Sequence, residues 1–345
     1  MDYKTAGVNI DAGNEAIRRI RTLARSTFTE GVLSDIGSFG GLFRLEPGRF
    51  RETVLVSSAD GVGTKLKVAF LAKRHDTIGV DLVNHCVNDI LVQGAAPLFF
   101  FDYLSVGRLS PEVAESIVGG MAAACRENNC ALLGGETAEM PGFYADGEYD
   151  VAGFIVGAVE RDKLITGRTI AVGDVLVGVP SSGLHTNGYS LARQIIFEHL
   201  KLDIGSQVLE LGQTVGDFLL EPHRSYLPLV RPLLDGGRLK GMAHITGGGI
   251  TENLPRMLPH GTAAVVDAAS WEFPPLFRWL QANGRVPMED MMRTFNMGIG
   301  LIIAVSRDRA EQLTEELAAR GGRDARIIGE VVRGEPPSVS YVNLP

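Results

Sequence analysis

Glycine-rich turns that directly follow β-rich runs constrain the fold of this chain more than any other feature of its sequence. The run at residues 53–60 leads into DGVGTK, and residues 131–133 lead into GGETAEMP. Residues 175–179 lead into SSGLHTNG, and HITGGG (244–249) precedes a helical segment. The chain has 42 glycines, about 12% of its residues against an average of about 7%. Turns of this kind expose backbone N–H groups at strand ends, where they can bind phosphate or carboxylate.

The order of the predicted elements indicates an α+β fold with two domains. A chain of 345 residues exceeds what one hydrophobic core usually fills. Strands and helices mix without a strict βαβ rhythm, which favours two α+β domains over one doubly wound sheet. A polar stretch at residues 166–173 precedes a fresh strand, so we place an N-terminal domain at residues 1–168 and a C-terminal domain at residues 169–345.

Apolar periodicity and turn signals give the approximate positions of the elements. In the first half we expect helices at residues 14–26, 65–73, 81–93 and from 111, and strands at 53–60, 98–106, 131–133 and 151–159. In the second half we expect strands at 175–179, 263–266, 300–305 and 326–332, and helices at 189–199, 225–234, 252–257, 274–282 and 309–320. The segment 134–150 is rich in glycine and proline, and we expect it to be a long loop.

Composition excludes several classes of protein. The chain has 33 Lys and Arg against 41 Asp and Glu, a net charge of -8, so we expect neither nucleic acid nor anionic lipid as a partner. We find no apolar stretch long enough to cross a bilayer and no apolar N-terminal leader, and therefore expect a cytoplasmic protein without membrane contact. Its three cysteines form neither a disulfide framework nor a zinc pattern.

The predicted helix at residues 81–93 separates its residues into an apolar and an oxygen-rich side. On a wheel of roughly 100° per residue, the polar side holds Asp81, Asn84, His85, Asn88 and Asp89. A solvated face is the simpler interpretation, because amphipathic helices are common. This face, however, has acids, amides and an imidazole but no basic residue, which favours a helix that faces Mg²⁺. Four histidines outside this helix and the loops are expected at the surface: His75, His199, His223 and His260.

Each glycine-rich turn is ambiguous when it is taken alone. DGVGTK lacks the spacing of a Walker A loop and could be an ordinary strand-to-helix turn. Glu136 follows two glycines and could be a metal ligand, a base or a cap. The loops at 181–188 and 244–249 could hold phosphate or could be tight turns that need glycine. No serine lies in a G-x-S-x-G elbow, so a serine hydrolase is not indicated.

Taken together and in order, these motifs resemble one family, the phosphoribosylformylglycinamidine cyclo-ligases, or aminoimidazole ribonucleotide synthetases, of purine biosynthesis. The resemblance covers nearly the whole chain. It rests on YKTAGVNIDAGN (3–14), SADGVGTK (58–65), GVDLVNHCVNDILVQGAAPLFFFDY (79–103), GGETAEMPGFY (134–144), DVAGF (150–154), SSGLHTNGYSL (181–191), HITGGGITENLPR (244–256) and RTFNMGIG (293–300).

The resemblance implies a homodimer whose N-terminal domains pair their sheets into a barrel, with ATP near that interface. It also implies a ligase that converts formylglycinamidine ribonucleotide and ATP to aminoimidazole ribonucleotide, ADP and phosphate through an iminophosphate. ATP and Mg²⁺ are the implied cofactors, with K⁺ as a candidate second ion.

By analogy with the same family, we assign candidate residues to each role. The catalytic candidates are Asp60, Asp89, Glu136 and Lys65, and the first three are also the metal candidates. The candidates for binding the nucleotide are Lys4, Gly61, Gly63, Thr64, Asp81 and Asn88. The candidates for binding the substrate, with its ribose phosphate, are Ser182, Gly183, His185, Asn187, Thr246, Gly247 and Gly248.

Three positions depart from what is common in that family. Asn84 and His85 stand where many members have Ala and Met, and Asn9 stands where Asp is common. One alternative is a kinase or amidotransferase-type relative with the same ATP site; its selenophosphate branch needs a reactive Cys near the N-terminus, and none precedes Cys86. A second alternative is a noncatalytic nucleotide-binding protein, against which the intact acids and phosphate loops argue.

Overall fold

The computed structural model describes residues 10–37 and 40–345 of the chain. The chain folds into two compact units, one running up to Ile90 and including Ala95–Arg161, the other made of Leu91–Gly94 and Asp162–Pro345. The domain boundary between residues 168 and 169 stays a prediction. Lys4 and Asn9 lie outside the described residues. Within the described ranges, no helix is long and apolar enough to span a membrane.

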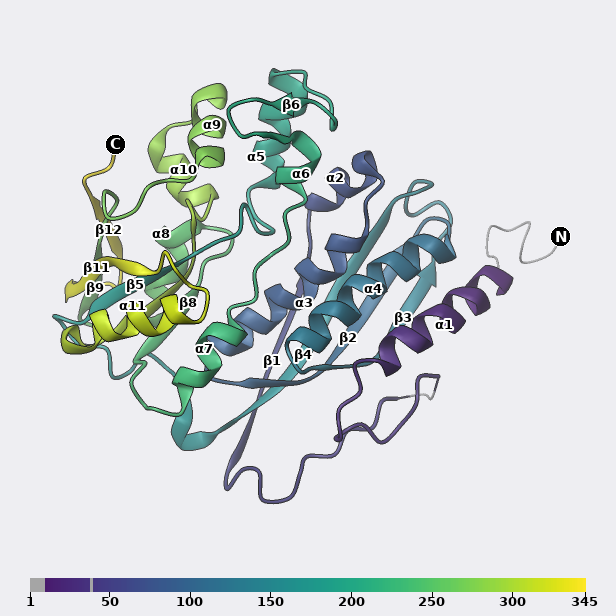
Figure 1. Cartoon of the computed structure of the whole chain (residues 1–345), viewed down its shortest axis with the longest axis horizontal. Helices are drawn as coiled ribbons and strands as arrows, with labels where there is room; N and C mark the ends of the chain where they lie inside the picture. Colours follow the sequence, from purple (N-terminus) through teal and green to yellow (C-terminus); the bar gives the residue numbers. More distant parts are fainter. Residues whose placement is uncertain (1–9, 38–39) are drawn as a thin grey trace. The chain divides into compact units, whose positions relative to one another are not determined.

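The first unit is a four-stranded sheet with helices α1, α3 and α4 over one of its faces (Figure 1). The strand order is β1-β4-β2-β3; β2 and β3 run parallel, and the other neighbours are antiparallel. The strands are β1 (Thr53–Gly61), β2 (Ala96–Val106), β3 (Ala131–Glu139) and β4 (Tyr149–Glu160), and the helices are α1 (Ile10–Arg25), α2 (Lys65–Ala72), α3 (Asp76–Leu91) and α4 (Pro111–Glu127).

The two faces of this sheet differ because side chains alternate along each strand. On the helix-covered face, Gly153 of β4 leaves room for the ring of Phe100 and for Leu82 of α3, and both side chains are fully buried. Burial of side chains of this size contributes roughly 2 kcal/mol each. On the opposite face, Leu55 is 59% exposed and Phe154 is 47% exposed. This second face therefore carries exposed apolar side chains.

Two glycines allow helices α3 and α4 to cross at very short range. A Cβ atom added at Gly79 would lie 2.0 Å from the carbonyl oxygen of Ile117, and one at Gly120 would lie 2.1 Å from that of Asp76. The crossing also buries a hydrogen bond of 2.9 Å from the Asn128 amide to Asn84 Oδ1. This side of α3 is therefore packed against protein.

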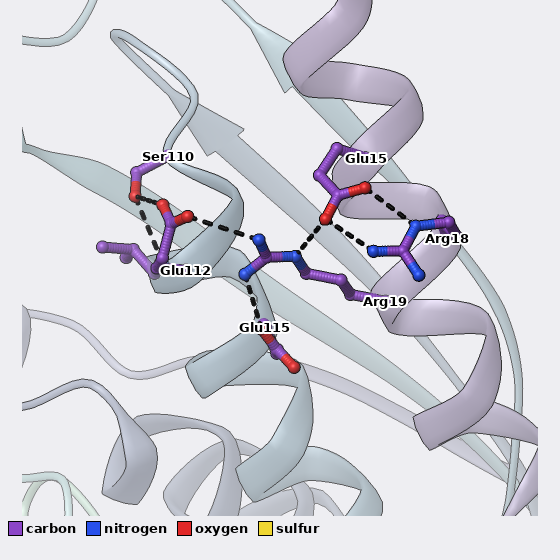
Figure 2. A network of polar contacts seen from close by, with 7 residues as sticks. Glu15, Arg18, Arg19, Ser110, Glu112 and Glu115 are labelled. Carbon is purple, nitrogen blue, oxygen red and sulfur yellow. Dashed lines mark hydrogen bonds and ion pairs between the residues drawn. The ribbon is translucent and has the colours of Figure 1, made fainter.

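Ion pairs on the surface link α1 to α4, as Figure 2 shows. The Arg19 guanidinium lies 2.8 Å from a carboxylate oxygen of Glu115 and 3.5 Å from one of Glu112. Glu15 accepts hydrogen bonds from Arg18 and Arg19, which hold the pKa of its carboxyl at about 2. Exposed pairs of this kind contribute little to stability, and α1 also packs directly against α4.

The second unit is built on a six-stranded sheet of order β12-β9-β11-β5-β10-β8, with β12 parallel to β9 and the other pairs antiparallel. Helix α11 packs on β5 and β11. The strands are β5 (Val175–Pro180), β8 (Gly241–His244), β9 (Thr262–Asp267), β10 (Ile299–Val305), β11 (Arg326–Arg333) and β12 (Val339–Val342), with a separate hairpin of β6 (Gln207–Val208) and β7 (Gln213–Thr214). The helices are α5 (Tyr189–Arg193), α6 (Val215–Leu219), α7 (Leu227–Leu234), α8 (Gly249–Asn253), α9 (Pro275–Gly284), α10 (Met288–Thr294) and α11 (Ala310–Ala319).

The prediction of a long loop at residues 134–150 was wrong for residues 134–139, which belong to β3, and for residues 149–150, which belong to β4. Strand β3 continues to Glu139, because its parallel pairing with β2 extends from Phe99 to Val106. Gly134 and Gly135 are part of this strand and serve close packing, since an added Cβ would lie 2.8 Å from the Phe101 ring and 2.3 Å from Asp102 Oδ1, respectively.

Candidate functional site

The end of β1 places Asp60 beside helix α3. Its carboxylate oxygen Oδ2 lies 2.7 Å from His85 Nε2, and its Oδ1 accepts a hydrogen bond of 2.7 Å from the Gly61 N–H. Burial alone would lower the pKa of His85, but the hydrogen bond and the charge of Asp60 outweigh it, so this pKa is raised. Burial opposes the ionised form of Asp60, yet His85 and the Gly61 N–H lower its pKa overall. Asp60 and His85 thus favour the charged forms of each other.

Asp89 lies on α3, one helical turn after His85. Ser58 donates a hydrogen bond of 2.9 Å to Asp89 Oδ2, and the charge of Asp89 acts on both Asp60 and His85. Two carboxylates near one another at the end of a strand form a donor set that suits a hard cation. Asp60 and Asp89 are therefore the pair of predicted acids that the structure brings together.

The turn after Asp60 begins helix α2. Gly63 has a φ of +65°, which glycine adopts without strain. Gly63 and Thr64 are exposed, and Thr64 precedes α2 without a side-chain cap. The Gly61 N–H already donates to Asp60. Gly63 and Thr64 are consequently the members of this turn that a phosphate could reach.

Three other predicted residues of this region are buried. Lys65 Nζ lies 2.8 Å from a carboxylate oxygen of Asp81, and both side chains are 0% exposed. Asn88 is 0% exposed as well. Much of the polar side of α3 thus faces protein, because Lys65 of α2 and Asn128, the residue after α4, supply buried partners for it.

Glu136 is separated from the other two acids. The strand register aligns Asp60 with Gly153, Gly153 with Asp102, and Asp102 with Gly135. Glu136 is the next residue along β3 and therefore points to the face of the sheet opposite that of Asp60. Three strand spacings of about 4.8 Å separate the two strands, or roughly 14 Å. Within one chain the structure does not bring Glu136 to Asp60 and Asp89.

In the second unit, the loop at 181–188 folds back on itself at the end of β5. The Ser182 N–H donates to His185 Nε2 at 3.2 Å, and Ser182 Oγ donates to the carbonyl oxygen of Pro222 at 2.6 Å. His185 has a φ of +60° and is 0% exposed. The Asn296 amide donates a hydrogen bond to the carbonyl oxygen of Gly183. These groups hold the loop, and the Asn187 side-chain amide nitrogen is a buried donor of this loop without a hydrogen-bond partner.

The loop at 246–248 presents unused donors in front of α8. The Asn253 amide donates to the carbonyl oxygens of Thr246, Gly247 and Gly249. Among the described residues, the N–H groups of Gly247 and Gly248 donate to no protein acceptor. Asn187 Nδ2 is shielded from solvent without a hydrogen-bond partner there, and a Cβ at Gly247 would lie 3.3 Å from Asn187 Oδ1. Backbone N–H groups and an amide that converge in this way suit a phosphate or carboxylate.

Two titratable groups, one buried and one half-buried, were not predicted from the sequence. His223 is 1% exposed, although we expected it at the surface; it lies between the rings of His185 and His244. Asp102 of β2 has a pKa raised to about 7 by burial. The alternation of β2 could have signalled that Asp102 points toward the helices, but no local pattern marks His223.

Comparison with protein families matches both units. The family described as AIR synthase related protein, N-terminal domain, matches residues 43–159, and its C-terminal domain counterpart matches residues 171–342. A phosphoribosylformylglycinamidine cyclo-ligase of Trichlorobacter lovleyi is 54% identical over 329 residues, which cover 95% of this chain and 94% of that protein. The protein of the same name from Alkaliphilus metalliredigens is 51% identical over 337 residues, covering 97% and 96%.

Solved structures with the same fold are more distant in sequence. Thiamine-monophosphate kinase from Stenotrophomonas maltophilia aligns with a TM-score of 0.69 at 20% identity, covering 94% of this chain and 96% of that one. The hydrogenase maturation protein HypE in complex with ATP aligns with a TM-score of 0.65 at 18% identity, covering 94% and 90%. At these identities the likeness concerns the fold.

Proposed function

This chain belongs to the family of phosphoribosylformylglycinamidine cyclo-ligases, and we propose how its residues divide the work of that reaction. The enzyme converts formylglycinamidine ribonucleotide and ATP to aminoimidazole ribonucleotide, ADP and phosphate in purine biosynthesis. The acids at the end of β1 and on α3 would serve the nucleotide. The loops at 181–188 and 246–248 would hold the substrate.

The chemistry requires that a formyl oxygen leave as part of a better leaving group. The formyl oxygen attacks the γ-phosphorus of ATP, the bond to the β–γ bridging oxygen breaks, and ADP departs from an iminophosphate. An amidine nitrogen then attacks the former formyl carbon, the C–O bond breaks, and phosphate leaves with that oxygen as the five-membered ring closes. The reaction thus needs charge stabilisation and positioning more than a protein nucleophile.

We assign Asp60 and Asp89 to the ion that accompanies ATP. Their nearby carboxylates, supported by Ser58 and the Gly61 N–H, have the chemistry of a Mg²⁺ donor set. Mg²⁺ held there would neutralise charge on the transferring phosphoryl group; K⁺ is a candidate second ion. Gly63 and Thr64 would contact phosphate oxygens. We assign the buried pair of Lys65 and Asp81, together with Asn88, a supporting role behind these ligands.

The substrate phosphate would bind at the unused donors of Gly247, Gly248 and Asn187. Thr246 and Ser182 hold the two loops through their own hydrogen bonds. His185 and Gly183 would complete the wall of this site. The observation that carries the assignment is the convergence of three donors that lack protein acceptors among the described residues.

A homodimer would explain the open face of the four-stranded sheet. Leu55, Tyr103 and Phe154 point to this face and are 59%, 39% and 47% exposed, and contiguous exposed apolar side chains commonly mark an interface. We propose that two copies pair these faces into a barrel, which would bring Glu136 to the interface, where it would serve ATP. The cytoplasm is the proposed compartment, because all three cysteines are free thiols.

The proposed assignment of acids is tested by turnover of purified protein with formylglycinamidine ribonucleotide, ATP and Mg²⁺. ADP and aminoimidazole ribonucleotide are expected in equal amounts. Asp89→Asn should reduce both products at least 100-fold with little change in the unfolding temperature, whereas the exposed Asp146→Asn should leave both intact. Full activity of Asp89→Asn would refute the metal assignment, and ADP without the imidazole would refute the coupled reaction.

A further inference from the structure

Three histidines form a buried cluster at one end of the second unit's sheet. His185 comes from the loop at 181–188, His223 from the segment between α6 and α7, and His244 from the end of β8. They are 0%, 1% and 6% exposed. A ligating nitrogen from each lies within 4.8 Å of the others. Three imidazoles could in principle bind zinc or form a hydrogen-bonded array, and the ring geometry distinguishes these two arrangements.

The geometry of the rings argues against a metal ion. The rings of His185 and His223 stack with centroids 4.0 Å apart and planes inclined by 21°. An imidazole lone pair lies in the plane of its ring, so two nearly parallel rings cannot both direct one to an ion at about 2.0–2.1 Å. His185 Nε2 also accepts the Ser182 N–H. The cluster is therefore a stacked and hydrogen-bonded array.

Within this array, His223 contacts both glycine-rich loops. Its Nε2 lies 3.0 Å from His244 Nε2, and its Nδ1 lies 3.4 Å from Thr186 Oγ1. A single proton lies between the two Nε2 atoms, since one must donate and the other accept. Together with the stacking on His185, these contacts join the loop at 181–188 to the residue that precedes the loop at 246–248.

One side of the array packs closely against strand β10. A Cβ at Gly300 of β10 would lie 2.0 Å from Tyr226 Oη and 2.6 Å from His185 Cε1. The Tyr226 hydroxyl in turn donates to the carbonyl oxygen of Pro180 at 3.0 Å. Close-packed interiors transmit displacements, and His223 contacts residues of both segments.

We infer that His223 is a positioning residue that sets the distance between Asn187 and the N–H groups of Gly247 and Gly248, and thereby the affinity for the substrate's phosphate. This inference rests on the proposed function of those two loops. His223 itself need not touch the substrate. Its effect should appear in substrate binding and not in the use of ATP.

Three variants separate the contacts that His223 makes. His223→Leu removes both the stacking and the hydrogen bonds, His223→Phe keeps a ring against His185, and His223→Gln keeps a polar group near His244. His260→Leu is the matched control, since the His260 side chain is 94% exposed in the same unit.

Steady-state kinetics and phosphate binding provide the readouts. His223→Leu should raise the KM for formylglycinamidine ribonucleotide about tenfold and weaken binding of inorganic phosphate similarly, while kcat and the KM for ATP change less than twofold. His223→Phe and His223→Gln should fall between wild type and His223→Leu. If His223→Leu does not fold, these two variants carry the test. His260→Leu should match wild type.

Other results would overturn the inference. One such result is a folded His223→Leu protein whose KM for formylglycinamidine ribonucleotide is unchanged. Another is a similar fold-change in kcat and in the KM values for both substrates in all three variants. If purified wild type retains one equivalent of zinc and His223→Leu does not, the three histidines form a metal centre and not a hydrogen-bonded array. If wild type makes no aminoimidazole ribonucleotide, the proposed function fails, and inorganic phosphate affinity alone then decides whether His223 positions the loops.

Discussion

Asp102 offers the sharpest test of how burial controls the stability of the first unit. Its carboxyl is partly buried on the helix-covered side of β2, between Gly153 and Gly135 in the register. No ion pair reaches it among the described residues. Burial raises its pKa from the ordinary 3.8 to about 7. The folded protein therefore holds a proton that the unfolded chain has already lost between about pH 4 and pH 7.

The sign and size of the effect follow from this difference in pKa. Because the folded state binds more protons in this window, stability falls as the pH rises through it. A pKa difference of one unit corresponds to about 1.4 kcal/mol, so the ionisation of Asp102 in the folded protein can lower the free energy of unfolding by at most about 4 kcal/mol. Residual contact of the Asp102 carboxyl with water reduces our expectation to about 2 kcal/mol. The free energy of unfolding of Asp102→Asn should exceed that of wild type by that amount at pH 8 and should be almost equal to it at pH 4.

Urea unfolding at both pH values measures the gain. Both tryptophans, Trp271 and Trp279, belong to the second unit, so their fluorescence follows that unit, while far-UV circular dichroism follows the whole chain. The pH-dependent gain should appear in the dichroism transition. The control is Asp146→Asn, an exposed acid of the first unit. An Asp102→Asn protein with the same pH dependence as wild type, or with lower stability at pH 8, would refute the reasoning.

Two further predictions concern the interior of the first unit. Lys65→Met alone should lower the free energy of unfolding by about 3–5 kcal/mol, because it removes the ammonium group that neutralises the buried Asp81 carboxylate. Lys65→Met with Asp81→Leu should recover most of that loss in urea unfolding, and equal stability of wild type and Lys65→Met would contradict this. Gly119→Ala should stabilise α4 by about 0.5–1 kcal/mol, since nothing lies within 4 Å of the new Cβ. Gly120→Ala, at the next position, should lower the unfolding temperature, because the new Cβ clashes with the Asp76 carbonyl oxygen. A higher unfolding temperature for Gly120→Ala than for Gly119→Ala would disprove the close crossing.

Local sequence patterns predicted much of the secondary structure. The strand expected at residues 53–60 is β1, Thr53–Gly61, and that expected at 151–159 is β4, Tyr149–Glu160. Alternation and β-branched residues suffice for such strands. The helix expected from residue 81 begins at Asp76. Gly79 favours a break in the local sequence, but in the structure it lies within the helix, where its missing side chain lets α3 pack closely against α4. The two glycines at 134 and 135 suggested a loop, but pairing with β2 is a tertiary effect that local propensity does not contain.

The candidate site was predictable only where one segment supplies its chemistry. Asp89 follows from the acidic pattern of α3, and Gly247 and Gly248 from their cluster. The link of Asp60 to His85 depends on how β1 meets α3, which motif spacing does not give. His223 lies 21 residues from His244 and 37 from Thr186, so its role depends on contacts distant in sequence.

The strand order of the first unit affects the tendency of the protein to aggregate in solution. Strands β1 and β3 are the two outer strands of the sheet, and in the described residues neither has a further neighbour on its outer side. Outer strands of nine residues present rows of unpaired backbone groups that can recruit other chains. A barrel closed by two copies would leave no such rows. Variants in which the pairing of two copies is weakened should then precipitate before any loss of turnover is measured.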